Sequence, residues 1–92
     1  MAEKDGLRIE KHSSVSLTVP VLIARANPKR YKLQVRPAGA NGCLVGVDEG
    51  MSDSNSYFIP QNDVLKLKTY KGAVYALSVT AVAAIYVVEE DV

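Results

Sequence analysis

The chain has 92 residues, of which 48% are hydrophobic and 23% are charged, and its formal net charge is +1. This length allows one domain with one core, and a chain so near neutrality has no long-range field that would attract nucleic acid. Cys43 is the only cysteine, which excludes an intrachain disulfide. We therefore expect one globular domain that does not bind nucleic acid.

The N-terminal segment Met1–Gly6 is polar and shows no periodicity, so we predict a flexible arm. It contains no apolar stretch of the kind that signal peptides carry, and we expect no signal peptide. The domain proper is expected to cover Leu7–Val92. The apolar stretch Ala73–Val88 is shorter than the about 20 residues that a membrane helix requires, so no membrane span is expected.

The first third of the domain alternates between apolar and polar residues, as strands with one buried face do. Leu7–Lys11 permits a short edge strand. Val15–Val19 alternates with a clean period of two and predicts a second strand with one face in the core, ended or bulged by Pro20, and the apolar run continues through Val21–Ile23. Asn27 and Pro28 mark a turn.

Arg30–Arg36 is the most strictly amphipathic stretch. We predict that Tyr31, Leu33 and Val35 share its buried face, while Arg30, Lys32, Gln34 and Arg36 face water or an acidic partner. Pro37–Gly42 is a loop, and its Asn41-Gly42 pair predicts a hairpin to a returning strand at Cys43–Val47.

The second half continues the strand pattern. Asp48–Ser56 is predicted to be a polar surface loop, followed by a short strand at Tyr57–Ile59 that Pro60 stops and another that starts at Val64. The runs Ala73–Val79 and Ala83–Val88 are rich in β-branched and aromatic residues, and we predict that they form an antiparallel hairpin.

Both faces of this predicted hairpin are apolar, which one small domain cannot cover alone, so we expect another chain to cover the second face. Glu89–Asp91 is expected to be an acidic tail. In total, seven or eight short strands without a long helix predict an all-β fold, a single small β-sandwich, jelly roll or barrel of antiparallel strands.

The sequence offers no catalytic constellation. His12 is the only histidine, and neither a triad of Ser52, His12 and Asp48 nor a Cys43–His12 dyad has a useful spacing. We therefore predict no enzyme, no catalytic residue, no cofactor and no metal.

Two further residue sets are more easily explained by structure than by ligand binding. The acidic and amide residues of the loops lack the EF-hand spacing; these are Asp48, Glu49, Asp53, Asn55 and Asp63. Five tyrosines are expected to pack in the core or at an interface rather than on bases or sugars; these are Tyr31, Tyr57, Tyr70, Tyr75 and Tyr86.

Several short motifs occur in a recognisable order, from Ala26–Arg30 through Leu33–Pro37, Gly46–Asp48, Phe58–Pro60 and Val64–Leu67 to Tyr70–Ala76. In this order the chain resembles small β-sandwich virion proteins of tailed bacteriophages. The resemblance covers about Val15 to Glu89, and Tyr70–Ala76 is its most specific part. Its motifs resemble fold determinants, with turns set by Asn27-Pro28 and Gly72 and with Arg30 paired to an acidic strand end.

The resemblance implies a structural protein of the virion that is assembled in the host cytoplasm. The type is a capsid decoration (cement) protein, which forms a homo-oligomer, a trimer by preference, and binds the major capsid protein or another virion protein. A tail or head-fibre component, or a small non-catalytic module that binds carbohydrate or protein, is the alternative. For the interface we predict Tyr70, Tyr75, Tyr86, Val74, Val88 and Arg30.

Overall fold

The fold is all-β, as the sequence predicts. A computed structural model describes residues 6–16, 18–38, 42–52, 55–79 and 83–92, and none of these residues is helical. The eight strands are β1 (Leu7–Val15), β2 (Val21–Ala24), β3 (Arg30–Pro37), β4 (Cys43–Gly46), β5 (Tyr57–Ile59), β6 (Leu65–Leu67), β7 (Val74–Ser78) and β8 (Ala83–Asp91).

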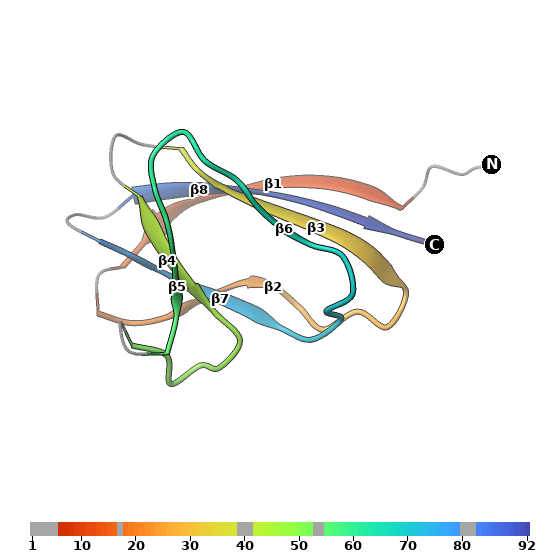
Figure 1. Cartoon of the computed structure of the whole chain (residues 1–92), viewed down its shortest axis with the longest axis horizontal. Helices are drawn as coiled ribbons and strands as arrows, with labels where there is room; N and C mark the ends of the chain where they lie inside the picture. The colour runs from red at the N-terminus through yellow and green to blue at the C-terminus, as the bar shows by residue number, and fades with distance from the viewer. Residues whose placement is uncertain (1–5, 17, 39–41, 53–54, 80–82) are drawn as a thin grey trace.

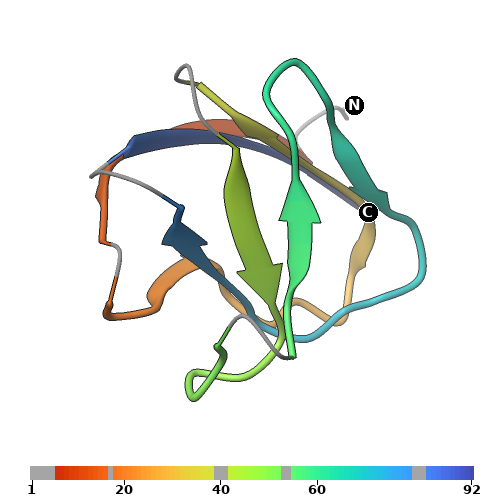
Figure 2. The same ribbon diagram turned by 60° about the vertical axis from the view of Figure 1, so that its left-hand side comes forward.

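The strands form two antiparallel four-stranded sheets that face each other (Figures 1 and 2). Sheet A has the order β1-β8-β3-β6, and sheet B has the order β2-β7-β4-β5. The first strand thus pairs with the last, the second with the seventh, the third with the sixth and the fourth with the fifth. The chain is one long antiparallel ribbon rolled into a sandwich, which is the topology of a jelly roll.

The core lies between the two sheets and is built from alternate residues of each strand. Sheet A contributes Leu33 and Val35 from β3 and Ile85 and Val87 from β8, none of them more than 3% exposed. Sheet B contributes a matching set of buried side chains, namely Ile23, Ala24, Cys43, Val45, Ile59, Val74 and Ala76. Burial of these apolar side chains is the main force that holds the sheets together.

Two predicted hairpins are wrong. β7 and β8 lie in opposite sheets, where β7 pairs with β2 and β4 while β8 pairs with β1 and β3. β3 and β4 are likewise in different sheets, and Asn41 lies outside the described residues. Periodicity shows which face of a strand is buried, but two strands with apolar inner faces can be neighbours in one sheet or partners across the core.

The strand predicted over Val15–Val19 is also wrong beyond its first residue. β1 ends at Val15, and Leu17 lies outside the described residues. The Ser16 hydroxyl oxygen accepts hydrogen bonds from the backbone N–H groups of Thr18 and Val19, at 3.0 and 3.2 Å. A local side-chain acceptor of this kind competes with a sheet ladder, and it leaves Val19 64% exposed at the turn between the sheets.

The faces of β3 are as predicted from Lys32 onward and reversed before it. The register against β8 shifts between Arg30, which lies opposite Asp91, and Lys32, which lies opposite Glu90. One extra residue, Tyr31, is accommodated in this bulge and is 49% exposed, while Arg30 turns into the interior and is fully buried. The predictions of a buried Tyr31 and a solvent-facing Arg30 are therefore wrong.

The two chain ends differ from expectation where they are described. Glu89–Asp91 is not an acidic tail. These residues form the end of β8, where they pair with β1 and β3. The predicted N-terminal arm lies outside the described residues except for Gly6, whose carbonyl accepts a 2.8 Å hydrogen bond from the Asp91 N–H.

Candidate functional site

One end of the sandwich is held by the buried guanidinium of Arg30. Its Nε donates to Glu89 Oε2 at 2.6 Å, and the side chain is 0% exposed. Its terminal nitrogens donate to the carbonyls of Gly72 at 2.8 Å, Tyr70 at 3.3 Å and Arg25 at 2.5 Å. Arg30 thereby joins β8 of sheet A to the segments that lead out of β2 and into β7 of sheet B. The prediction that Arg30 pairs with an acidic strand end is confirmed.

Glu89 is shared between two arginines. Arg8 donates to Glu89 Oε1 at 2.7 Å and to Asp91 Oδ2 at 2.7 Å, and Asn27 Nδ2 also donates to Asp91 Oδ2 at 2.7 Å. Burial opposes ionisation of Glu89, but the hydrogen bonds from Arg8 and Arg30 outweigh it and lower its pKa. The hydrogen bonds from Arg8 and Asn27 lower the pKa of Asp91. Both carboxylates are therefore ionised at neutral pH.

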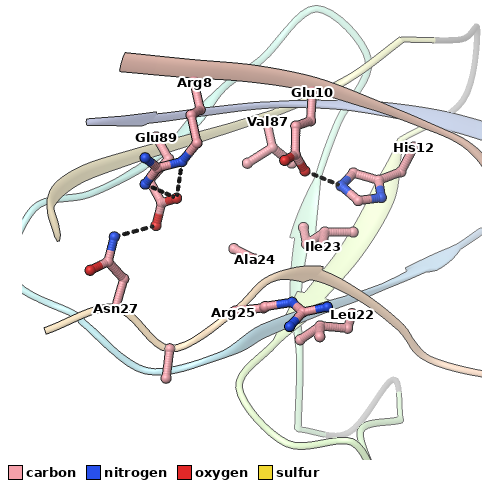
Figure 3. A pocket seen from close by; sticks show the side chains of 11 residues that line it. Arg8, Glu10, His12, Leu22, Ile23, Ala24, Arg25, Asn27, Val87 and Glu89 are labelled. Carbon is pink, nitrogen blue, oxygen red and sulfur yellow. Dashed lines mark hydrogen bonds and ion pairs between the residues drawn. The ribbon is translucent and has the colours of Figure 1, made fainter. Parts of the chain in front are cut away.

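Next to this cluster the sandwich is open between the edges of β1 and β2, where a cleft of about 490 Å³ lies (Figure 3). Arg8, Glu10 and His12 point into it from β1, and Ile23 and Ala24 form part of its opposite wall. The inward side chains of β1 from Arg8 to His12 are thus polar, while Leu7 and Ile9 face outward and Val15 at the end of the strand is in the core. The cleft therefore contains charged and polar side chains, whereas the core cluster between the two sheets is apolar.

The chemistry available in the cleft is limited. His12 Nε2 lies 3.3 Å from Glu10 Oε1, so an imidazole and a carboxylate are side by side in the cleft. Among the described residues that line the cleft, none has a hydroxyl or a thiol. Cys43 is fully buried on β4, away from the cleft lining, and burial raises the pKa of its thiol to about 11. Its sulfur is a neutral core atom.

Two of the loop residues with oxygen side chains, Asp48 and Asn55, accept hydrogen bonds in local turns. Asp48 Oδ1 accepts from the Gly50 N–H at 3.0 Å, and Asn55 Oδ1 accepts from the Ser52 N–H at 2.6 Å. Asp53 lies outside the described residues. In the part of the chain that the structure describes, His, Cys, Asp and Glu side chains nowhere gather in a group of three that could hold a metal ion.

The outward face of sheet B is apolar. The register places on one face five side chains that are all apolar or aromatic; these are Leu22, Leu44, Phe58, Tyr75 and Leu77. We call this set the sheet B face. Phe58 is 48% exposed and Leu22 is 39% exposed, Leu44 and Tyr75 are half-buried, and Leu77 is buried at 6%. Met51, from the loop that follows β4, packs over Gly46 and is itself buried. Its side chain therefore covers the end of this face at Gly46.

The outward face of sheet A differs in its charge. It alternates apolar side chains such as Ile9 and Val88 with Lys11, Lys32, Gln34, Arg36 and Lys66. The ring of Tyr86 lies between two cations, with Lys11 Nζ 5.6 Å and the Arg36 guanidinium 5.3 Å from its centroid. These cation–π contacts cover the ring and fit a solvated surface better than a dry interface.

The six predicted interface residues do not form one patch. Arg30 and Val74 are fully buried within this chain, so their side chains have no surface left for a neighbour, and this part of the prediction is wrong. Tyr70 packs against the core and donates its hydroxyl to the Ala73 carbonyl at 2.9 Å. Tyr86 and Val88 are on the outward face of sheet A.

Only Tyr75 among the six lies on the sheet B face. Leu22, Leu44 and Phe58 were not predicted as interface residues from the sequence. A signal for Leu44 is present, because Cys43–Val47 is apolar at the positions of both faces.

Comparison of the sequence with protein-family models and with curated proteins gives no match. The resemblance to virion proteins therefore depends on the short motifs alone. Among the described residues, no helix has the length and hydropathy to cross a membrane.

Proposed function

We propose that the protein is a structural, non-catalytic virion module of the capsid decoration type, and that it attaches to its partner through the sheet B face. The observation that carries this proposal is the composition of that face. All five of its side chains are apolar or aromatic, and no charged residue interrupts them. Contiguous exposed apolar patches are uncommon on monomeric proteins and mark interaction sites.

The energetics favour a protein partner. Removal of apolar surface from water contributes about 25 cal/mol for each Å². Aromatic side chains such as Phe58 and Tyr75 are enriched at the centres of interfaces, where charged residues are depleted. The sheet B face has this composition, whereas the outward face of sheet A has the mixed composition of a solvated surface.

A decoration protein needs a rigid body, and two features of this chain supply one. The jelly roll presents the sheet B face on four hydrogen-bonded strands rather than on loops. The Arg30–Glu89 cluster joins the two sheets at one end. A face held in this way loses little conformational entropy on binding.

The test is cosedimentation with tailed-phage heads assembled from the major capsid protein of the same genome. We expect the wild-type protein to sediment with the heads and Phe58→Lys to stay in the supernatant, because it places an ammonium group at the most exposed side chain of the face, on its edge strand β5. Val19→Lys is the matched control, since Val19 is 64% exposed and lies away from this face at the turn before β2. Equal binding of Phe58→Lys and wild type would exclude the sheet B face, and absence of wild-type binding would exclude the capsid assignment.

The structure gives little support to the alternative function, a carbohydrate-binding module. It was based on exposed tyrosines near Asp48 and Asn55, but both side chains accept hydrogen bonds within their own loop. A change of tyrosine fluorescence on addition of glycans, without binding to heads, would favour this alternative.

A further inference from the structure

β1 is the edge strand of sheet A, and its outer edge has a regular hydrogen-bonding pattern. The Asp91 N–H bonds to the Gly6 carbonyl, and the register continues from Leu7 opposite Glu90 to His12 opposite Ile85. Bonded and non-bonded pairs alternate along an antiparallel ladder. Arg8, Glu10 and His12 therefore direct their backbone groups toward β8, while Leu7, Ile9 and Lys11 direct theirs outward.

This edge carries two exposed apolar side chains. Leu7 is 55% exposed and Ile9 is 68% exposed, and both lie on the outward face of sheet A. Among the described residues, β1 has a neighbouring strand on one side only. A long edge strand with exposed apolar side chains is a template for pairing with another chain, unless charges or proline block it. The charged side chains of this edge, Arg8, Glu10 and Lys11, favour one register of such a pairing over the neighbouring registers.

We propose that two copies of this chain join edge to edge through β1, in an antiparallel pairing with its twofold axis at Ile9. In this register Ile9 lies opposite Ile9 of the second copy, and Leu7 lies opposite Lys11. Arg8 lies opposite Glu10, in a non-bonded pair whose side chains are closest. The outward backbone groups of Leu7, Ile9 and Lys11 then bond across the axis, and sheet A continues into its copy.

The registers on either side of this one bring like charges together. A side chain must stay on its own face, so the twofold axis can move only from one residue to the next along β1. An axis at Glu10 places the two Glu10 carboxylates opposite each other, and an axis at Lys11 does the same with the two ammonium groups. Like charges directly opposite each other destabilise a strand pair. An axis at Arg8 opposes the two guanidinium groups, whereas the axis at Ile9 pairs Arg8 with Glu10 and avoids these repulsions.

The pairing also completes an apolar row. Ile9 is in register with Val88 of β8, and both line a shallow depression with Tyr86 and Val64 on the outward face of sheet A. In the proposed dimer this row runs Val88, Ile9, then Ile9 and Val88 of the second copy. Ile9 packs against its copy and becomes less exposed to water, without any change in the fold of either copy.

This inference is independent of the sheet B face, since β1 belongs to the other sheet. It predicts a twofold dimer where the resemblance to virion proteins implies a trimer. The two proposals can therefore fail separately.

The register is tested by disulfide trapping. Opposite bonded residues have Cα atoms about 5.5 Å apart, which is within the range for a disulfide. We expect Ile9→Cys to form a covalent dimer under mild oxidation. Leu7→Cys and Lys11→Cys should each remain uncrosslinked alone, because the two copies of Leu7 are about 13 Å apart, and should crosslink when mixed. Wild type is the control, since Cys43 is fully buried.

The association itself is tested by sedimentation equilibrium. We expect a wild-type dimer and at least about a tenfold weaker association for Ile9→Lys, which opposes two ammonium groups across the axis. Glu10→Lys should weaken the dimer too, because it faces Arg8 of the second copy. Circular dichroism should show that both variants keep the β-sheet fold. A wild-type monomer at the highest soluble concentration, a trimer, or an oxidised Ile9→Cys that remains monomeric would each overturn the proposal.

Discussion

Arg30 and Glu89 form a buried ion pair across β3 and β8, in which Arg30 Nε lies 2.6 Å from Glu89 Oε2. The guanidinium is fully buried, and it also donates to three backbone carbonyls in the segments that follow β2 and precede β7. Removing one partner of such a pair costs more than the pair itself contributes, because it leaves an uncompensated charge in the interior.

Glu89→Gln is therefore expected to destabilise the fold by about 3 kcal/mol, the low end for a buried pair, because Arg30 keeps its carbonyl acceptors. In a domain of this size each kcal/mol lowers Tm by about 4–8 °C. Glu90→Gln is the matched control. Glu90 is the next residue on β8 and faces outward, with Lys32 Nζ 3.9 Å away, so its loss should cost less than about 1 kcal/mol. Similar losses for the two variants, measured by urea unfolding, would contradict the role of Arg30.

Stability should decrease in acid. The pKa values of Glu89 and Asp91 are lower in the folded state than in the unfolded chain, so the unfolded state binds more protons. Their contribution is complete above the unfolded values of about 4 and is lost as the pH falls through the lower folded values. Asp91→Asn removes one of these groups, and its unfolding midpoint in urea should change less with pH below about 4 than that of wild type. Parallel pH profiles for the two proteins would exclude this linkage.

Gly42 is expected to be intolerant of a side chain. A Cβ atom there would lie 2.2 Å from the Ile59 carbonyl oxygen and 2.7 Å from the Phe58 ring, and a backbone oxygen in the β4–β5 pair cannot move aside easily. Gly42→Ala should cost about 1–3 kcal/mol, as overpacking does. At Gly50 the nearest contact would be Asp48 Oδ1 at 3.7 Å, so Gly50→Ala should stay within about 0.5 kcal/mol of wild type. Thermal unfolding of both variants is the measurement, and an equally mild Gly42→Ala would show that β4 and β5 separate readily.

Cys43 should not react with thiol reagents in the native protein. Its side chain is fully buried and burial raises the pKa of the thiol to about 11, so at pH 8 neither access nor thiolate is available. We expect Ellman's reagent to label it only at the rate of unfolding, and rapidly once denaturant is added. Rapid labelling of the native protein would mean that the core opens at β4.

How much of the fold the sequence determines can be judged from particular strands. The period of two in β3 from Lys32 onward correctly predicts a strand and its buried face, because alternate side chains point to opposite sides of a sheet. The β-branched and aromatic composition of Ala83–Val88 correctly predicts a strand, but not which of its faces is buried. Composition likewise predicts an all-β fold. The pairing of Arg30 with an acidic strand end was also available from the sequence, through its motifs.

The tertiary structure alone decided which strands are neighbours and which faces are free. β7 and β8 look like a hairpin in sequence but lie in opposite sheets, because apolar inner faces can pack across the core as well as side by side in one sheet. The bulge at Tyr31 buries Arg30, and a bulge inserts one residue without any change in composition. The sheet B face combines β2, β4, β5 and β7, which are distant in sequence, so it exists only after those strands have been brought together.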